Sequence, residues 1–237
     1  MNVFKSLFGL EPEDVQESCI VLPCINKDLL AAFGVGDVRR GKLYGFAQGD
    51  GFTLIHARIG ACFAGDIVLY LRETAARQVF LFGSCGSTGG LDIGRLVMPV
   101  RCFAKESFSS LLYEAEPGPG RIFYPDERLA DVFFNGIKGG RVDKATCMTL
   151  PSLKLEEALG QQFKDFGIDV VDMECSAFFA AASKAALPAV ALFYVSDIIN
   201  SKPFYADLNE FDQKSMKTGM TYGIEALCDF LRKSPGD

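Results

Sequence analysis

Short apolar runs alternate with longer segments of helical spacing along this chain, and that alternation limits the folds open to it. The run at residues 78–82 (Q-V-F-L-F) has no polar alternation, which is typical of a strand in a sheet covered on both faces. A helical pattern precedes it at 65–77, with Ile67 and Leu71 on one side. With no repeat and no linker, the pattern predicts one α/β domain over residues 1–237, built on a mixed, mostly parallel central sheet flanked by helices.

The other expected elements follow the same alternation. Strands are expected at residues 19–23, 41–47, 51–59, 95–103, 144–149, 170–174 and 188–195. Helices are expected at residues 27–33, 126–135, 153–166, 175–186 and 209–232. Ligands bind at the carboxyl ends of the strands in sheets of this kind. The residues that follow these strands are therefore the first candidates for a site.

The composition excludes several classes of protein. The 237 residues are 49% hydrophobic and 23% charged, which is unlike the composition of a disordered chain. The net charge of −6 argues against nucleic acid as a partner, because such partners require a basic surface. No apolar run approaches the roughly 20 residues of a membrane-spanning helix, and the first residues do not resemble a secretory signal. We therefore expect a soluble, cytoplasmic protein without a membrane partner.

Metal and disulfide chemistry are not expected either. The eight cysteines include no C-x-x-C pair and mostly lie in apolar runs, which favours buried free thiols over disulfides or zinc. His56 is the single histidine of the chain, so neither a histidine-based metal site nor a Ser-His-Asp triad is expected. The sequence predicts no metal and no cofactor.

Three expected strand ends carry polar side chains, and the first is the glycine-rich segment 83–90 (G-S-C-G-S-T-G-G). Glycines free the backbone to turn N–H groups inward, and hydroxyls add donors, so the segment can cradle an oxyanion. It lacks the lysine of a phosphate-binding P-loop and the G-x-G-x-x-G spacing. Taken alone, it is better interpreted as a sharp turn that needs glycine.

The second and third strand ends carry carboxylates. Met173 and Glu174 precede an alanine-rich helix, where a carboxylate either complements the helix dipole or accepts hydrogen bonds from paired sugar hydroxyls, and both interpretations stay open. Ser196 and Asp197 end the strand expected at 188–195. A helix or turn cap is the favoured interpretation of this pair alone, and a partly desolvated general acid is the functional one.

Together, the three segments resemble the nucleoside phosphorylase and nucleosidase superfamily, which includes purine nucleoside phosphorylase, uridine phosphorylase and methylthioadenosine nucleosidase. The motifs that carry the resemblance are Gly83-Ser84-Cys85-Gly86, Met173-Glu174-Cys175-Ser176-Ala177 and Val195-Ser196-Asp197, with Ala57-Arg58-Ile59-Gly60-Ala61 upstream. The resemblance covers about residues 20–231. It implies a phosphorylase/hydrolase-like α/β fold whose sheet is partly barrel-like.

Members of this superfamily cleave the N-glycosidic bond of a nucleoside through an oxocarbenium-like transition state. That chemistry needs an acid for the leaving base, hydrogen bonds to the ribose and a nucleophile below the sugar. By position, the resemblance implies that Asp197 protonates or hydrogen-bonds the leaving base. Glu174 would hold the 2′- and 3′-hydroxyls, and Met173 would pack on the ribose.

The resemblance also implies where the nucleophile and the base would bind. Ser84 would contact phosphate or the attacking water, together with the backbone of its neighbours Gly83, Cys85 and Gly86. The candidates for contact with the base are Phe108, Leu150 and Ser196.

The chain departs from the family's pattern at the phosphate. Two arginines of the family's phosphorylases are replaced here by Asp28, after the first strand, and by Leu81, before the glycine-rich segment. Each lost charge-assisted contact costs about 1.5–3 kcal/mol. Arg58 stands where a glycine is usual and is the candidate replacement, although an ordinary surface charge is the more common role for such a residue. The glutamate with which the nucleosidases orient water is also missing from residues 24–28.

The sequence therefore predicts a nucleoside phosphorylase that uses inorganic phosphate as co-substrate and releases a free base and ribose 1-phosphate. Purine and pyrimidine nucleosides both stay open as substrates. Two alternatives remain: a nucleosidase that uses water, and a non-catalytic nucleoside-binding protein of the same fold. The family's assemblies imply a homodimer or a dimer-based hexamer.

Overall fold

The computed structural model describes residues 2–113, 121–137 and 142–233, and one mixed sheet runs through all of these segments. Its strands are β1 (Ser18–Leu22), β2 (Arg39–Arg40), β3 (Gly45–Gln48), β4 (Thr53–His56), β5 (Gln78–Ser87), β6 (Leu96–Ala104), β7 (Arg121–Phe123), β8 (Val142–Thr149), β9 (Val170–Asp172) and β10 (Ala189–Ile198). The two longest ladders, β5–β10 and β6–β8, are parallel, and antiparallel pairs occur at both ends of the sheet.

Five of these strands close into a barrel. The order β10–β6–β8–β9–β5 is completed by a pairing of β10 with β5. The remaining strands β1, β4, β3 and β2 continue from β5 as an open sheet. The prediction of an α/β fold with a mixed, partly barrel-like sheet is confirmed.

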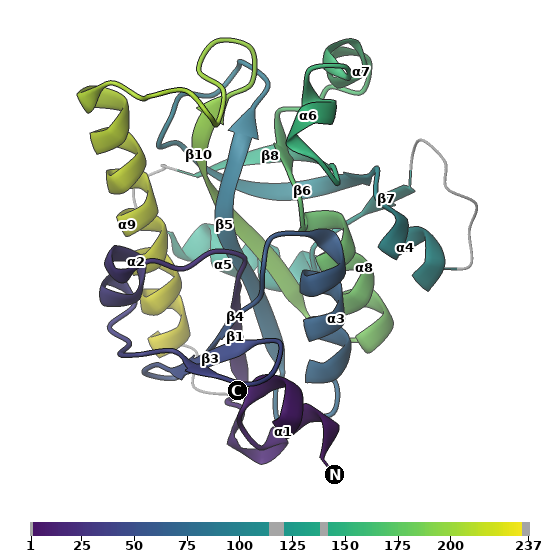
Figure 1. Ribbon diagram of the computed structural model, residues 1–237, viewed down its shortest axis with the longest axis vertical. Helices are drawn as coiled ribbons and strands as arrows, with labels where there is room; N and C mark the ends of the chain where they lie inside the picture. The colour runs from purple at the N-terminus through teal and green to yellow at the C-terminus, as the bar shows by residue number, and fades with distance from the viewer. Residues whose placement is uncertain (1, 114–120, 138–141, 234–237) are drawn as a thin grey trace.

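Helices cover the sheet on two sides (Figure 1). They are α1 (Val3–Phe8), α2 (Lys27–Ala32), α3 (Ala61–Leu71), α4 (Ser107–Leu112), α5 (Glu127–Gly136), α6 (Leu153–Glu156), α7 (Gly160–Asp165), α8 (Cys175–Ala185) and α9 (Glu210–Lys233). Helices α3 and α8 pack on each other against one face, and α9 packs against β10 together with α2 on the other. No helix in the described part of the chain is both long and apolar enough to cross a membrane.

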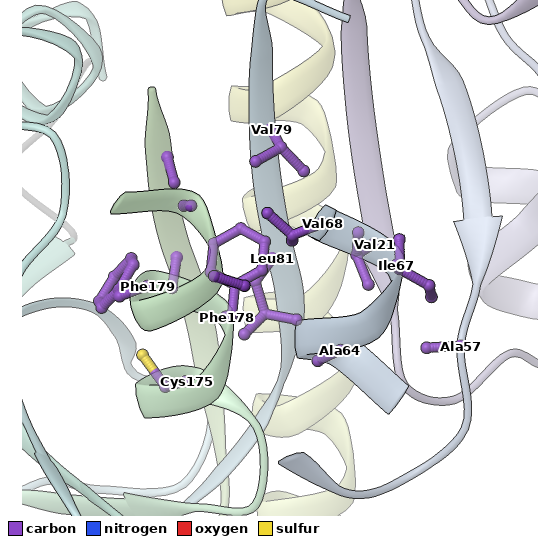
Figure 2. Packing of buried hydrophobic residues seen from close by; sticks show 14 of the residues in the cluster. Val21, Ala57, Ala64, Ile67, Val68, Val79, Leu81, Cys175, Phe178 and Phe179 are labelled. Atoms are coloured by element: carbon purple, nitrogen blue, oxygen red, sulfur yellow. The ribbon is translucent and has the colours of Figure 1, made fainter. Parts of the chain in front are cut away.

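The run at 78–82 explains how β5 organises both layers. Val79 and Leu81 point into the apolar cluster formed with α3 and α8 (Figure 2), whereas Phe80 and Phe82 point into the cluster on the α9 side. All four side chains have no exposed surface. The uninterrupted apolar run is therefore a strand with both faces buried, as predicted.

Two expectations about local structure are wrong. The glycine-rich segment is not a turn after residue 82, because β5 continues to Ser87 and pairs there with β10 and β9. The single helix expected at 153–166 is divided into α6 and α7. The division falls next to Gly160, and glycine is a poor helix former.

Candidate active site

The three strands that carry the polar segments lie side by side at Gly86. Residue 86 of β5 has Val171 of β9 beside it on one edge and Asp197 of β10 on the other. Because β5 and β10 run parallel, their carboxyl ends lie at the same end of the barrel, toward α6 (Figure 1). Strand β9 runs antiparallel to β5, so Met173 and Glu174, which follow β9, point back along β5 and away from that end.

Gly86 is a glycine because Asp197 occupies the space beside it. A Cβ atom on residue 86 would lie 2.9 Å from Asp197 Oδ2 and 3.3 Å from Val171 Cγ2. The first distance is below the van der Waals contact that a carbon and an oxygen atom tolerate, so a side chain here would displace the carboxylate. The glycine-rich segment serves a close approach of a side chain rather than a turn.

Asp197 is a buried carboxyl at an irregularity in β10. The register of β10 against β5 shifts between Val195 and Asp197, which leaves Ser196 as the extra residue of a β-bulge. Asp197 is 5% exposed, and burial raises its pKa, although the hydrogen bond with Ser196 opposes the shift. A raised pKa keeps the proton of this carboxyl available for transfer.

Ser196 links Asp197 to the backbone of β5. Its Oγ lies 2.6 Å from Asp197 Oδ1 and 3.3 Å from the carbonyl oxygen of Cys85. The hydroxyl has one proton to donate, and the shorter contact shows that it goes to Asp197, where it stabilises the carboxylate.

Glu174 is the second buried carboxyl, at the N-cap position of α8. Its Oε1 accepts a hydrogen bond of 2.6 Å from the backbone N–H of Gly60. Gly60 adopts a φ of 127°, a conformation that favours glycine. Glu174 is 5% exposed, and burial raises its pKa to about 7, against the opposing effect of the backbone hydrogen bonds.

Asp172 holds the turn that carries Glu174. Its Oδ2 accepts from the backbone N–H groups of Glu174 at 2.8 Å and of Cys175 at 2.5 Å, and its Oδ1 accepts from the Thr149 hydroxyl at 2.6 Å. Burial first, and then the neighbouring Cys102 and Glu174, raise the pKa of Asp172 well above its ordinary value. The sequence does not indicate this role of Asp172, since a carboxylate at a strand end gives no sign of which N–H groups it meets.

The predicted sugar and nucleophile contacts divide into accessible and buried groups. Gly83, Ser84 and Met173 keep partial exposure next to the two carboxyls, whereas Cys85 and Gly86 are buried. Cys85 therefore takes part through its carbonyl oxygen, which receives the Ser196 hydroxyl. Ser84 and Met173 remain available to a ligand.

The positions of the missing arginines supply no cation. Leu81 is fully buried, and Asp28 forms an exposed ion pair of 2.8 Å with Lys217 of α9. Arg58 is exposed, two residues before Gly60, and makes no hydrogen bond or ion pair with any residue that the structure describes. Its charge and that of Arg40 lower the pKa of His56, after the larger effect of burial. Within the described ranges, Arg58 is thus a cation without a partner near the end of β4.

Phe108 and Leu150, two of the residues expected to contact the base, both pack against other parts of the protein. Phe108 of α4 packs against α3, where a Cβ on Gly65 would lie 2.3 Å from its ring. Leu150 is 1% exposed within an apolar cluster at the end of β8.

Glu156 of α6 is a residue that the sequence did not single out. Burial and the charge of Asp197 raise its pKa to about 7, so a third carboxyl faces the same region.

This arrangement can bind a polyol and protonate a leaving group. One buried carboxyl is held by a backbone N–H and by its place at a helix start, and burial raises the pKa of the other. A partly exposed hydroxyl lies on the strand between them. These are the parts that cleavage of a bond to a sugar requires.

A protein of this fold and this site belongs to a known class. The sequence profile of the phosphorylase superfamily matches residues 11–229, and the chain belongs to that superfamily. No curated protein sequence is significantly similar to it.

Solved structures share the fold at low identity. Uridine phosphorylase from Vibrio fischeri, complexed with 6-hydroxy-1-naphthoic acid, superposes with a TM-score of 0.78 at 19% identity, over 94% of each chain. AMP nucleosidase from Bacteroides thetaiotaomicron gives 0.71 at 18% identity, over 95% of this chain and 94% of that one. The 5′-methylthioadenosine/S-adenosylhomocysteine nucleosidase from Neisseria meningitidis gives 0.71 at 17% identity, over 92% and 99%. The shared feature is the fold.

Proposed function

We propose that this protein is a nucleoside phosphorylase, which transfers the ribosyl group of a nucleoside to inorganic phosphate. The observation that carries the proposal is the pair of buried carboxyls, Glu174 directly after β9 and Asp197 on β10, the two strands that flank β5 at Gly86. A protein that only bound a nucleoside would not need an acid with a raised pKa beside the sugar site. Membership of the phosphorylase superfamily supports the same chemistry.

The two carboxyls have separate roles in the proposed reaction. The C1′–N bond breaks with its electron pair moving to the base, and Asp197 neutralises that charge by donating its proton or a hydrogen bond. Glu174, as the anion, accepts hydrogen bonds from the 2′- and 3′-hydroxyls, which fixes C1′ relative to the nucleophile. A phosphate oxygen then bonds to C1′. The reaction balances with protons and phosphate alone, so we propose no metal and no cofactor for it.

Arg58 is the proposed contact to phosphate, together with Ser84. The guanidinium is exposed and unpaired among the described residues, on the loop whose Gly60 N–H binds Glu174.

Hydrolysis is the second candidate function, and it is favoured by a specific observation. Leu81 and Asp28 place an apolar side chain and a paired carboxylate where two cations would be expected.

Incubation of the purified protein with purine and pyrimidine nucleosides, with and without phosphate, tests the proposal. Base release that requires phosphate and yields ribose 1-phosphate is the expected result. Release without phosphate would replace phosphorolysis by hydrolysis. No release by folded protein, combined with measurable nucleoside binding, would leave a binding protein.

Variants then separate the proposed roles. Asp197→Asn is expected to lower kcat by about 10²–10⁴-fold, while Arg58→Ala raises the KM for phosphate. Arg39→Ala is the matched control for Arg58, because Arg39 is also an exposed arginine, on β2. Equal effects of the two arginine changes would contradict the role of Arg58.

We extend the proposal to a cytoplasmic homodimer or dimer-based hexamer. Analytical sedimentation would test the oligomeric state.

A further inference from the structure

Three buried cysteines converge beneath the candidate active site. Cys102 of β6 and Cys147 of β8 are direct neighbours across the parallel ladder, and Cys175 is the first residue of α8. Their sulfur atoms all lie within 4.8 Å of one another, and none of the three side chains has exposed surface. In the segments that the structure describes, no other cysteine, histidine or acidic side chains form a group of three this close.

The distances suit a shared metal ion. Three sulfurs bound at about 2.3 Å around one ion, the length of a zinc–thiolate bond, lie about 4 Å apart in a trigonal plane. The sulfurs therefore need to move by less than about 1 Å to reach that geometry. Cys175 approaches from the helix and the other two from the barrel, so the three sulfurs come from different directions around a common centre (Figure 2 shows Cys175).

Hydrogen bonds already orient two of the thiols. Cys147 Sγ lies 3.4 Å from Asp172 Oδ1 and donates to it, and Cys102 Sγ lies 3.3 Å from Thr149 Oγ1. These contacts fix the directions of the free thiols, and the proton that Cys147 donates to Asp172 leaves when a metal ion binds. Asp172 accepts from Thr149 and from two backbone N–H groups, so it is not counted as a ligand.

We propose that Cys102, Cys147 and Cys175 form a trigonal binding site for a soft, thiophilic metal ion of low charge, namely Cu(I). Thiolate ligands select soft ions, and three sulfurs without a fourth ligand suit Cu(I) better than zinc, whose structural sites are tetrahedral. None of the three sulfur-bearing side chains is open to bulk solvent. Binding replaces the three S–H bonds by metal–sulfur bonds and releases the protons.

Such an ion would join β6 and β8 to the start of α8. Cys175 directly follows Glu174, so the ion would also stiffen the turn that presents this carboxyl. The inference does not depend on the proposed reaction. Its test measures metal binding and stability rather than turnover.

The experiment is a Cu(I) titration of the full-length protein under anaerobic conditions, against a colorimetric chelator. The exposed thiols are first removed by Cys24→Ser and Cys62→Ser. Since the site has no open surface, the protein is loaded both in the native state and during refolding. One Cu(I) per chain is expected, with ultraviolet thiolate-to-copper absorption, a higher melting temperature, and protection of the three thiols from alkylation mapped by mass spectrometry.

Substitutions assign the site. Cys147→Ala is expected to weaken Cu(I) binding by about 100-fold or more, whereas Cys19→Ala, at an equally buried cysteine of β1, leaves it unchanged. Alkylation mapping of the unsubstituted cluster keeps the test valid if Cys147→Ala does not fold. Absence of Cu(I) binding, binding that survives Cys147→Ala, or one tightly held zinc in place of Cu(I) would each overturn the proposal.

Discussion

Replacing Glu174 by glutamine should stabilise this protein at alkaline pH while it removes activity. The carboxyl is 5% exposed, with a pKa raised from 4.5 to about 7 by burial. A carboxyl whose pKa is higher in the folded than in the unfolded chain binds its proton more tightly when folded. The free energy of unfolding therefore falls as the pH rises from about 4.5 to about 7, and the loss persists above that window.

The size of the effect follows from the shift. The difference between 4.5 and about 7, at 1.36 kcal/mol per pKa unit, corresponds to a cost of about 3 kcal/mol at pH 8. Glutamine avoids that cost, and the net shift already includes the favourable hydrogen bond from Gly60 to the anion. We expect Glu174→Gln to be more stable than the natural chain by about 3 kcal/mol at pH 8 and about equally stable at pH 5.

Urea denaturation of both proteins at pH 5, 6, 7 and 8 measures this difference. Glu73→Gln, at an exposed glutamate, is the control for general effects of removing one negative charge. Nucleoside cleavage by Glu174→Gln should fall by about 10²-fold in the same preparations. A stability difference that does not grow between pH 5 and pH 8, or that equals the Glu73 control, would refute the reasoning.

Three further predictions rest on the same site. Gly60→Ala places a side chain at a φ of 127° and should lower the free energy of unfolding by about 1–3 kcal/mol; Gly36→Ala, in open space without a positive φ, is the control in urea denaturation, and equal losses would contradict the strain argument. Thr149→Val removes the hydroxyl that donates to Asp172 and should lower the free energy of unfolding by about 1–3 kcal/mol. An unchanged urea midpoint would show that Asp172 does not need this donor. The pH profile of kcat/KM should rise as Glu174 ionises, since burial raises its pKa to about 7. Glu174→Gln should abolish that rise, and a profile that is flat in the natural chain would exclude the role of Glu174 as an anion.

Much of the fold follows from local pattern. The run at 78–82 is apolar at every position except the first, and only a strand with both faces covered buries such a run. The helix expected at 126–135 is present as α5, where Asp126 Oδ1 accepts from the N–H of Leu129 at 2.8 Å. Helix caps and the spacing of apolar residues depend on only a few neighbouring residues, so they can be recognised directly in the sequence.

The extent of β5 could not be predicted in the same way. Four glycines in residues 83–90 suggest a turn, because glycine weakens isolated strands. In the protein, β5 continues because β10 and β9 lie on its two edges and pair with its backbone. A glycine is required at position 86 because the side chain of Asp197 lies too close for a Cβ atom, and not because the chain turns there.

The amino-acid sequence by itself indicated most of the longer helices and strands, their order, and the polar segments that follow or end three of the strands. These features depend on the spacing of apolar residues and on helix caps within short segments, so they can be predicted without knowing which distant residues pack together. The tertiary structure decided which atoms meet. Glu174 receives the N–H of Gly60 from 114 positions away, and three thiols from β6, β8 and α8 come within 4.8 Å. Such meetings depend on the order and register of strands in the closed sheet, which the whole chain sets by burying both of its apolar layers at once.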